Sequence, residues 1–379
     1  MAMLTELRDK EISLKIARKI KEISKNLGNV KIMNFCGTHE WVITHYGLRY
    51  LMPESVELIA GPGCPVCITP ARYVDAVVKL AMEGVRVMTF GDSYRLMGSR
   101  KSGLPRSLEE ARERGANVEI VYSMLDAIRM AKDGKESAFF AVGFETTAPA
   151  VLAPLRSGEV PSNLSLVVAH RLTPPIMRYV LERFPGSPIK GVIAPGHVST
   201  VVGSSAWEFV ATEYRIPVVV SGFEPVDVLL SILEIVRQIA RGEARLFNEY
   251  SRAVSKEGNR RAIEVMRSTT EVVDADWRGI GIVPDSGLVL KDEFSEFDAL
   301  RRYDVGESSL NFDDSLPGCR CAEITLGMIR PTECPLFMRA CTPERPYGPC
   351  MVSSEGTCLI WAKYRGSEFL RGLAEDLSV

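Results

Sequence analysis

The sequence has little net charge and lacks any long apolar run, and each shortage excludes a class of protein. Its 379 residues carry a formal net charge of −2, so the charge balance does not favour a nucleic-acid partner. The most apolar stretch, residues 216–239, is interrupted by Glu224, Asp227 and Glu234, and we therefore expect no membrane-spanning segment. Residues 1–15 are rich in charge and lack the apolar core of a signal peptide. These absences predict a cytoplasmic protein that binds neither nucleic acid nor membrane.

Nucleotide-binding signatures and paired zinc knuckles are also missing. The turn at Gly143–Thr147 contains no phosphate-binding lysine, and neither a Walker-type motif nor a dinucleotide fingerprint occurs elsewhere. The chain has a single C-x-x-C pair, Cys64 and Cys67, whereas structural zinc sites usually combine two such pairs. A lone C-x-x-C at a turn is typical of a dithiol that forms a disulfide reversibly, and this redox role is the one we predict.

Cysteine, in contrast, is abundant. Nine cysteines in a chain expected to lie in a reducing compartment indicate metal ligation or redox chemistry rather than a disulfide framework. The last six fall in one proline-rich segment, which excludes a long helix or a central strand there. Six thiols exceed the four that a zinc ion or an iron–sulfur cluster needs, and their mostly long spacings favour a cluster. Spacing alone leaves open which four would be ligands among Cys319, Cys321, Cys334, Cys341, Cys350 and Cys358.

The rest of the chain alternates short runs rich in valine and isoleucine with glycine-bearing turns and helical patterns. This alternation predicts βαβ units, that is, an α/β fold with mostly parallel sheets whose ligands bind beyond the carboxyl ends of the strands. A weak internal repeat predicts two similar lobes, over residues 30–135 and 136–240, that face each other across a cleft. We expect an N-terminal helix within residues 1–29, and connecting helices with a small irregular iron–sulfur domain within residues 241–379.

Reactive side chains follow several of the predicted strands. Cys36 lies where a strand should end and a helix begin, a position that lowers the pKa of a thiol. His39 can reach the same side of that helix, so the two residues suit a transition metal such as iron, copper or zinc, or the nucleophile pair of a thiol hydrolase. Isolated carboxylates and imidazoles at the other strand ends are typical of binding clefts and equally of solvated loops: Asp92, Glu145, His170, His197 and Glu224. Of these, we select Asp92, Glu145 and His197 as candidate cofactor-binding residues.

Five distinctive motifs follow one another along the chain. They are CGTHE at Cys36–Glu40, GCPVC at Gly63–Cys67, GFETT at Gly143–Thr147, PGHVS at Pro195–Ser199 and CMVSSEGTC at Cys350–Cys358. In this order they resemble the HypD family of hydrogenase maturation factors over nearly the whole chain. The resemblance implies an accessory protein for nickel–iron hydrogenase and not a hydrogenase itself.

The resemblance also implies cofactors and partners. With a small partner, HypC, the chain would form the platform on which an Fe(II) ion receives its cyanide and carbon monoxide ligands. Cyanide would come from HypE with HypF, and the Fe(CN)2CO group would then pass to the hydrogenase large-subunit precursor. The family's [4Fe-4S] cluster is bound by C-x14-C-x6-C-x16-C, which falls on Cys319, Cys334, Cys341 and Cys358.

The remaining residues then acquire expected roles. Cys36 would bind the iron, because a soft thiolate suits a low-spin Fe(II) ion, and His39 would be a further ligand or handle protons. Cys321 and Cys350 remain as a second thiol pair that would exchange electrons with the C-x-x-C pair through thiol–disulfide exchange. The competing hypothesis is a thiol-dependent hydrolase or transferase that uses Cys36 and His39 and carries a structural metal in the C-terminal tail.

Overall fold

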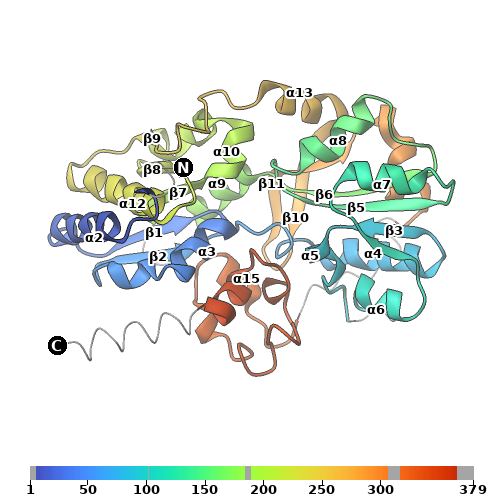
Figure 1. Cartoon of the computed structure of the whole chain (residues 1–379), viewed down its shortest axis with the longest axis horizontal. Coiled ribbons are helices and arrows are strands. Elements are labelled where there is room, and N and C mark those ends of the chain that lie inside the picture. The colour runs from blue at the N-terminus through green and yellow to red at the C-terminus, as the bar shows by residue number, and fades with distance from the viewer. Residues whose placement is uncertain (1–5, 101, 184–188, 306–315, 365–379) are drawn as a thin grey trace.

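The computed structural model describes residues 6–100, 102–183, 189–305 and 316–364 (Figure 1). Its strands are β1 (Val30–Asn34), β2 (Val56–Ala60), β3 (Arg86–Thr89), β4 (Val118–Ile120), β5 (Ser137–Gly143), β6 (Leu164–His170), β7 (Gly191–Pro195), β8 (Val218–Ser221), β9 (Leu246–Asn248), β10 (Thr270–Trp277) and β11 (Gly281–Leu290). Its helices are α2 (Lys10–Ser24), α3 (Gly37–His45), α4 (Ala71–Met82), α5 (Gly91–Tyr94), α6 (Leu108–Glu113), α7 (Met124–Ala131), α8 (Ala148–Arg156), α9 (Thr173–Arg183), α10 (Gly196–Val202), α11 (Glu208–Thr212), α12 (Pro225–Ala240), α13 (Arg260–Thr269), α14 (Ala299–Arg302) and α15 (Cys321–Thr325). Short 3-10 helices are η1 (Leu48–Leu51), η2 (Ser204–Trp207), η3 (Asp292–Phe297), η5 (Pro331–Glu333) and η6 (Pro349–Met351).

The strands form two parallel sheets and one antiparallel hairpin. The first sheet has the order β2-β1-β7-β8-β9 and the second has the order β4-β3-β5-β6, while β10 pairs with β11. The sheets lie at opposite ends of the molecule, and the hairpin stands between them (Figure 1). Every residue of β5 and β7 is buried, as expected for parallel strands with helices on both faces. The predicted α/β class with parallel sheets is confirmed.

The division of the strands differs from the predicted ranges 30–135 and 136–240. β7 pairs with β1 across the chain, and β5 pairs with β3, so the whole second sheet is inserted between β2 and β7. The first four strands of each sheet nevertheless share one order. When the strands of a sheet are numbered along the chain, the second strand lies at the edge, followed by the first, the third and the fourth, and β9 is an additional fifth strand in the first sheet. The strand equivalent to β1 is therefore β3, whereas the predicted repeat matched β1 with β6. Spacing along the chain does not say which strands pair, because pairing is a long-range contact.

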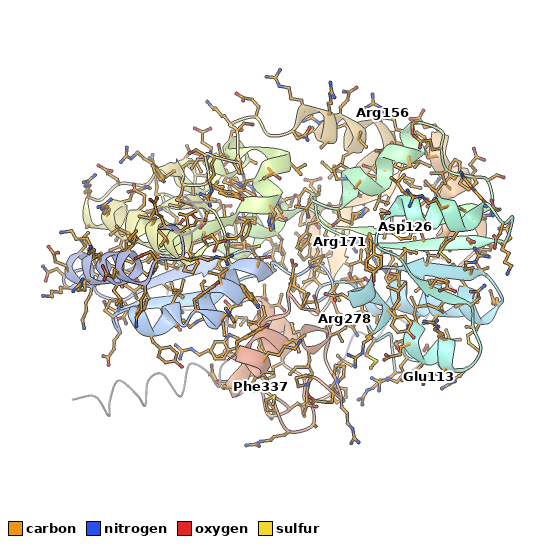
Figure 2. The ribbon with its side chains drawn as sticks, in the orientation of Figure 1. Glu113, Asp126, Arg156, Arg171, Arg278 and Phe337 are labelled. Carbon is orange, nitrogen blue, oxygen red and sulfur yellow. A yellow bond between two sulfur atoms is a disulfide. The ribbon has the colours of Figure 1, made fainter. Side chains whose placement is uncertain are left out.

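The turn end of the hairpin is joined to the end of β6 and to the loop after α5 by two buried arginines (Figure 2). Arg171, which follows β6, donates from Nε and Nη2 to the carbonyl oxygen of Asp276 in β10, at 3.1 and 3.0 Å. Arg278 follows β10 and donates to the carbonyl oxygen of Met97 at 2.7 Å. Hydrogen bonds from charged donors are stronger than those between neutral groups, so these contacts hold the hairpin in place between the sheets.

The N-terminal helix and the cysteine-rich segment both flank the first sheet. The predicted N-terminal helix is α2, which begins after Asp9, whose carboxylate accepts a hydrogen bond from the N–H of Ile12 at 2.8 Å. The C-terminal unit, which we define as residues 316–364, contains α15, η5, η6 and a helical segment at 357–364, and it lies beside α3 and α5 (Figure 1). No helix in the described part of the chain has the length and apolarity needed to cross a membrane.

Candidate functional site

Cys36 occupies the predicted position between a strand and a helix. It follows β1 and is the N-cap residue of α3, with extended backbone angles. Its side chain is only 8% exposed, and this burial raises the pKa of the Cys36 thiol to about 12, with the charge of Glu355 as the second cause. The N–H groups of His39 and Thr38 act in the opposite direction. The expected lowering of the thiol pKa by the helix start is therefore outweighed by desolvation.

Two glycines let other segments approach this turn closely. The N–H of Gly37 donates to the carbonyl oxygen of Gly63 at 3.2 Å, and a Cβ added to Gly63 would lie 2.4 Å from the backbone nitrogen of Cys36. A Cβ added to Gly37 would lie 2.5 Å from the Cβ of Glu355. Any side chain at either position would collide with its neighbour. The C-x-x-C loop and the C-terminal unit thus both pack directly against the Cys36 turn.

The cysteines predicted as thiol pairs are neighbours in space. Cys64 and Cys67 are joined by a disulfide, and the N–H of Cys67 donates to the sulfur of Cys64 at 3.2 Å. The sulfur atoms of Cys321 and Cys350 lie 2.7 Å apart, and the hydroxyl oxygen of Thr325 lies 3.3 Å from the sulfur of Cys350. The two sulfur atoms of each pair therefore lie in direct contact.

One small cavity, which we call the cysteine cavity, brings these groups together. Its lining includes Cys36, Cys64, Cys67 and Cys350, which come from three separate parts of the chain. Its volume is about 10 Å³, which is roughly the space that one water molecule requires. The four sulfur-bearing side chains are between 2% and 8% exposed. The site is therefore a small buried chamber lined by the thiols of Cys36 and Cys350 and by the Cys64–Cys67 disulfide.

The four cysteines that belong neither to the cysteine cavity nor to a thiol pair all lie in the C-terminal unit: Cys319, Cys334, Cys341 and Cys358. Cys334, Cys341 and Cys358 are each 7–8% exposed and belong to one apolar cluster. Burial raises the pKa of Cys341, and the neighbouring thiols of Cys319 and Cys334 raise it further. Among the described residues, no three Cys, His, Asp or Glu side chains converge closely enough to hold a single metal ion.

Both candidate histidines stack on Phe223, which follows β8. Nε2 of His39 donates to the carbonyl oxygens of Ser221 and Gly222 at 3.2 and 3.0 Å, and its ring lies 4.7 Å from that of Phe223. The ring of His197 lies 3.8 Å from the same phenyl ring. Burial lowers the pKa of His39 to about 4, and its Nδ1 makes no hydrogen bond with the described residues. His39 is therefore neutral, with the lone pair on Nδ1.

Glu145 lies away from the cysteine cavity, at the start of α9. Its two carboxylate oxygens accept hydrogen bonds from the N–H and the hydroxyl of Thr173, at 2.7 and 2.8 Å. Burial raises the pKa of Glu145 to about 7, although the bonds from Thr173 act against the rise. The carboxyl group of Glu145 thus holds the first turn of α9 in place.

The elevated pKa of Glu145 predicts a stability that depends on pH. The folded chain keeps this proton up to about pH 7, whereas the unfolded chain releases it near 4.5, so the stabilisation is complete below pH 4.5 and is lost as the pH rises through 7. The loss corresponds to roughly 3 kcal/mol. Urea unfolding measures the free energy of unfolding at pH 4.5 and at pH 8. The difference between these two free energies should be smaller in Glu145→Gln than in the wild type by roughly 3 kcal/mol. Glu113→Gln, at an exposed position of α6, is the control, and equal differences in both variants would contradict this assignment.

Asp92, in α5, also holds a structural element. Its Oδ2 accepts hydrogen bonds from the hydroxyl of Ser353 at 2.9 Å, and from the N–H and hydroxyl of Ser354, both at 3.1 Å. Burial raises the pKa of Glu355 to about 7, and the nearby Asp92 charge raises it further. Asp92 thus ties the C-terminal unit to the second sheet beside the Cys36 turn.

The two remaining strand-end residues have other surroundings. His170 is fully buried, and neither of its ring nitrogens has a hydrogen-bond partner among the described residues. Glu224 accepts from Nε and Nη2 of Arg8 at 2.5 and 2.8 Å. Neither residue lines the cysteine cavity.

Glu40 is the residue that sequence reasoning missed. It is 1% exposed and accepts from Nη2 of Arg49 at 2.7 and 2.8 Å and from Nε1 of Trp361 at 2.7 Å. Thr44 and Asn34 donate to it at 3.2 Å each. The available signal was a carboxylate one turn after Cys36 that is followed at once by the apolar run Trp41–Ile43. Glu40 joins β1, α3 and the C-terminal unit at the wall of the cysteine cavity.

Comparisons with known proteins agree with this arrangement of motifs. A family model described as HypD, the hydrogenase formation hypA family, matches residues 11–365. The chain is 43% identical to the hydrogenase maturation factor HypD2 of Bradyrhizobium diazoefficiens over 373 residues, which cover 94% of this chain and 95% of the relative. It is 40% identical to a putative hydrogenase expression/formation protein of Methanocaldococcus jannaschii over 368 residues, covering 96% and 99%. It is 36% identical to the hydrogenase maturation factor HypD of Escherichia coli over 379 residues, covering 97% and 99%. The chain therefore belongs to the HypD family of hydrogenase maturation factors.

Proposed function

We propose that this chain is the cytoplasmic platform on which, together with HypC, the Fe(CN)2CO group is assembled before it passes to the hydrogenase large-subunit precursor. HypE, with HypF, would supply the cyanide. The observation that supports this most is the cysteine cavity, because it places Cys36 beside the C-x-x-C pair and Cys350. A metal centre that must receive ligands and electrons needs a thiolate and redox thiols at one point.

Cys36 would bind the iron of the assembled group, which is the substrate of this protein. Its sulfur is a soft ligand suited to an electron-rich Fe(II) ion, and its burial keeps bulk water away. His39 would add the lone pair on Nδ1 or hold the local backbone through Nε2. The competing thiol hydrolase has less support. Nδ1 of His39 makes no hydrogen bond with any described residue and Nε2 is engaged by carbonyls, so Cys36 and His39 do not form a nucleophile pair.

The C-terminal unit would be the iron–sulfur domain. Its Cys319, Cys334, Cys341 and Cys358 would hold a [4Fe-4S] cluster, which supplies single electrons when bound. The fit is supported by the burial of three of these residues in one apolar cluster, and by the N–H of Tyr347, which donates to the sulfur of Cys341 at 3.3 Å. Together these four thiols would hold the cluster, whereas a site for one metal ion would need them to converge on a single point.

The two thiol pairs would link that unit to the iron. The contact between Cys321 and Cys350 lies at the boundary between the C-terminal unit and the cysteine cavity, where the C-x-x-C pair is the next dithiol. Reduction of the Cys64–Cys67 disulfide by two thiols would yield two thiols there and a disulfide between Cys321 and Cys350, so electrons and atoms balance.

The proposal is tested by anaerobic purification of the chain with HypC. We expect a brown protein with four cluster irons, and infrared bands of bound cyanide and carbon monoxide. Cys334→Ala should remove the visible absorption, whereas Cys321→Ala, outside the ligand set, should retain it. A colourless protein with stoichiometric zinc would contradict the proposal and favour the hydrolase.

A further inference from the structure

One wall of the cysteine cavity is a short turn, residues 353–356, which we call the strap. The strap follows η6, precedes the helical segment at 357–364, and contributes Glu355 to the lining of the cavity. Its backbone packs directly on the start of α3, because a Cβ added to Gly37 would lie 2.5 Å from the carbonyl oxygen of Glu355. The strap is thus one of the segments that cover Cys36, whose side chain is 8% exposed.

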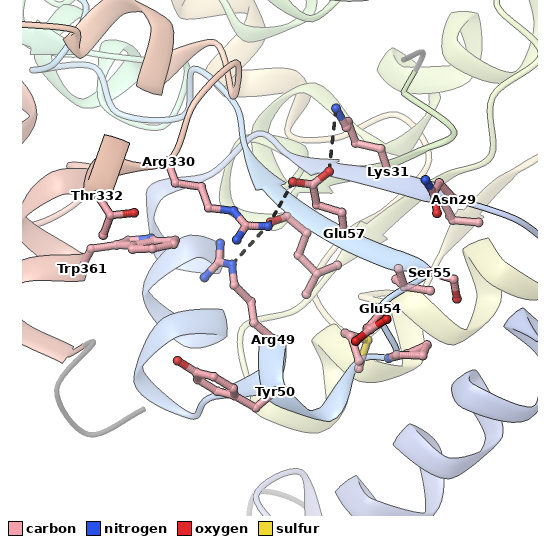
Figure 3. Close-up of a pocket in the computed structure, with 15 residues that line it drawn as sticks. Asn29, Lys31, Arg49, Tyr50, Glu54, Ser55, Glu57, Arg330, Thr332 and Trp361 are labelled. Atoms are coloured by element: carbon pink, nitrogen blue, oxygen red, sulfur yellow. Dashed lines mark hydrogen bonds and ion pairs between the residues drawn. The ribbon is translucent and has the colours of Figure 1, made fainter. Parts of the chain in front are cut away.

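Both ends of the strap are fixed by buried side chains. Before the strap, Cys350 is 2% exposed and its sulfur lies 3.3 Å from the hydroxyl oxygen of Thr325. After the strap, Nε1 of Trp361 donates to Glu40 at 2.7 Å. The guanidinium carbon of Arg49 lies 5.1 Å from the centre of the Trp361 ring, and Figure 3 shows the two side chains next to each other. A movement that uncovers Cys36 from this side is therefore confined to the turn between these two anchors.

The middle of the strap is held by side chains. Oδ2 of Asp92 accepts three hydrogen bonds, from the hydroxyl of Ser353 at 2.9 Å and from the N–H and hydroxyl of Ser354 at 3.1 Å each. The hydroxyl of Thr38 lies 3.5 Å from the strap carboxylate, which makes a long and weak hydrogen bond. No backbone–backbone hydrogen bond joins residues 353–356 to a described residue outside the C-terminal unit. Asp92 is therefore the main contact that keeps the strap closed.

The C-x-x-C loop, which forms another wall of the cavity, is held more firmly. The N–H of Gly61 donates to the carbonyl oxygen of Asn34 at 2.7 Å, and the N–H of Gly37 donates to that of Gly63 at 3.2 Å. The loop is also closed by its own disulfide. Regions that open locally are those with few backbone contacts to the core and with hydrogen bonds near the surface. By this criterion the strap, whose Ser354 is exposed, opens before the loop does.

We propose that the strap opens and closes over Cys36, and that Asp92 holds it closed. Release of the hydrogen bonds to Asp92 uncovers the Cys36 sulfur without unfolding either sheet. Asp92 follows β3 of the second sheet, whereas Cys36 follows β1 of the first, and the C-terminal unit lies beside both (Figure 1). A displacement of one sheet relative to the other therefore changes access to Cys36. This inference concerns a thiol of the chain itself and does not rest on the proposed function.

The proposal is tested by alkylation of the full-length chain, purified without partners, with iodoacetamide, and by mass spectrometry of Cys36. The reagent is larger than the cavity of about 10 Å³, so labelling reports an opened state. When closing is faster than labelling, the labelling rate is proportional to the population of that state. Asp92→Ala should raise the rate roughly tenfold, which corresponds to about 1.4 kcal/mol in the opening equilibrium.

Asp126→Ala is the matched control. Asp126 also lies in the first turn of a helix, α7, and also accepts a hydrogen bond from a serine hydroxyl, that of Ser123 at 2.8 Å. It belongs to the second sheet's layer of helices and lies away from the C-terminal unit (Figure 2). Its labelling rate at Cys36 should equal that of the wild type. A wild-type rate in Asp92→Ala, or equal acceleration in both variants, would overturn the proposal.

Ser354→Ala decides the question if Asp92→Ala lowers the melting temperature. It removes the hydroxyl that bonds Asp92 from the exposed side of the strap and should accelerate labelling about threefold. The double variant should label no faster than Asp92→Ala alone, because both changes remove the same contact. Low urea should leave the rate unchanged, since a local opening exposes little surface, and a rate that follows global unfolding would contradict the proposal. Alkylation needs no iron or partner, so its outcome is independent of the infrared test of the assembly function.

Discussion

Replacing Cys36 by alanine should abolish the infrared bands of bound cyanide and carbon monoxide while leaving the visible absorption of the cluster. Cys36 is the one cysteine of the cavity outside the two thiol pairs, and its sulfur is the soft ligand available to Fe(II). The cluster residues belong to the C-terminal unit and should keep their cofactor. The measurement is infrared and visible spectroscopy of the chain purified anaerobically with HypC.

Cys36→Ser is the matched variant for this prediction. It keeps the shape and a hydrogen-bonding group but replaces the soft sulfur by a harder oxygen, so we expect the bands to be lost there too. Equal melting temperatures for both variants and the wild type would exclude unfolding as the cause. Bands of wild-type intensity in Cys36→Ala would remove Cys36 from the iron site.

Replacing Glu40 by alanine should lower the free energy of unfolding by about 3–5 kcal/mol, the usual cost of removing one partner of a buried ion pair. The change would leave the Arg49 guanidinium, whose side chain is 18% exposed, without its carboxylate, and would remove the acceptor of Trp361 Nε1–H. Urea unfolding followed by tryptophan fluorescence measures the loss.

Glu57→Ala is the control, because Glu57 also pairs with basic residues but is 39% exposed. Exposed ion pairs contribute about 0–1 kcal/mol, so this variant should unfold nearly as the wild type does. Equal losses of unfolding free energy in the two variants would mean that the buried hydrogen bonds of Glu40 to Arg49 and Trp361 add no extra stability. The comparison separates the burial of the ion pair from its charge.

Local features were predictable from the sequence. The run at 30–34 is a strand, Cys36 caps the following helix, and Lys10–Ser24 is the N-terminal helix, because each depends on residues that are close along the chain. The same holds for the C-x-x-C pair, whose two residues are three positions apart. Chemistry encoded in a contiguous motif can be recognised before the fold is known.

Pairing over long distances was not predictable. Asp92 and Glu145, predicted as cofactor-binding residues, accept hydrogen bonds from Ser353 and Thr173. These contacts span 261 and 28 positions, and no local pattern indicates them. The same reason explains why the strands of the two sheets were divided differently from the predicted ranges.

The sequence by itself determined the alternation of strands and helices, the family, and the side chains able to bind a metal or exchange electrons. The tertiary structure alone decided which of those side chains meet and how dry their surroundings are. Glu40 contacts Trp361 across 321 positions, and Cys36 is enclosed by two segments that the sequence places far from it. Desolvation depends on this enclosure, and so the pKa of the Cys36 thiol rises where its place at a helix start had predicted a fall.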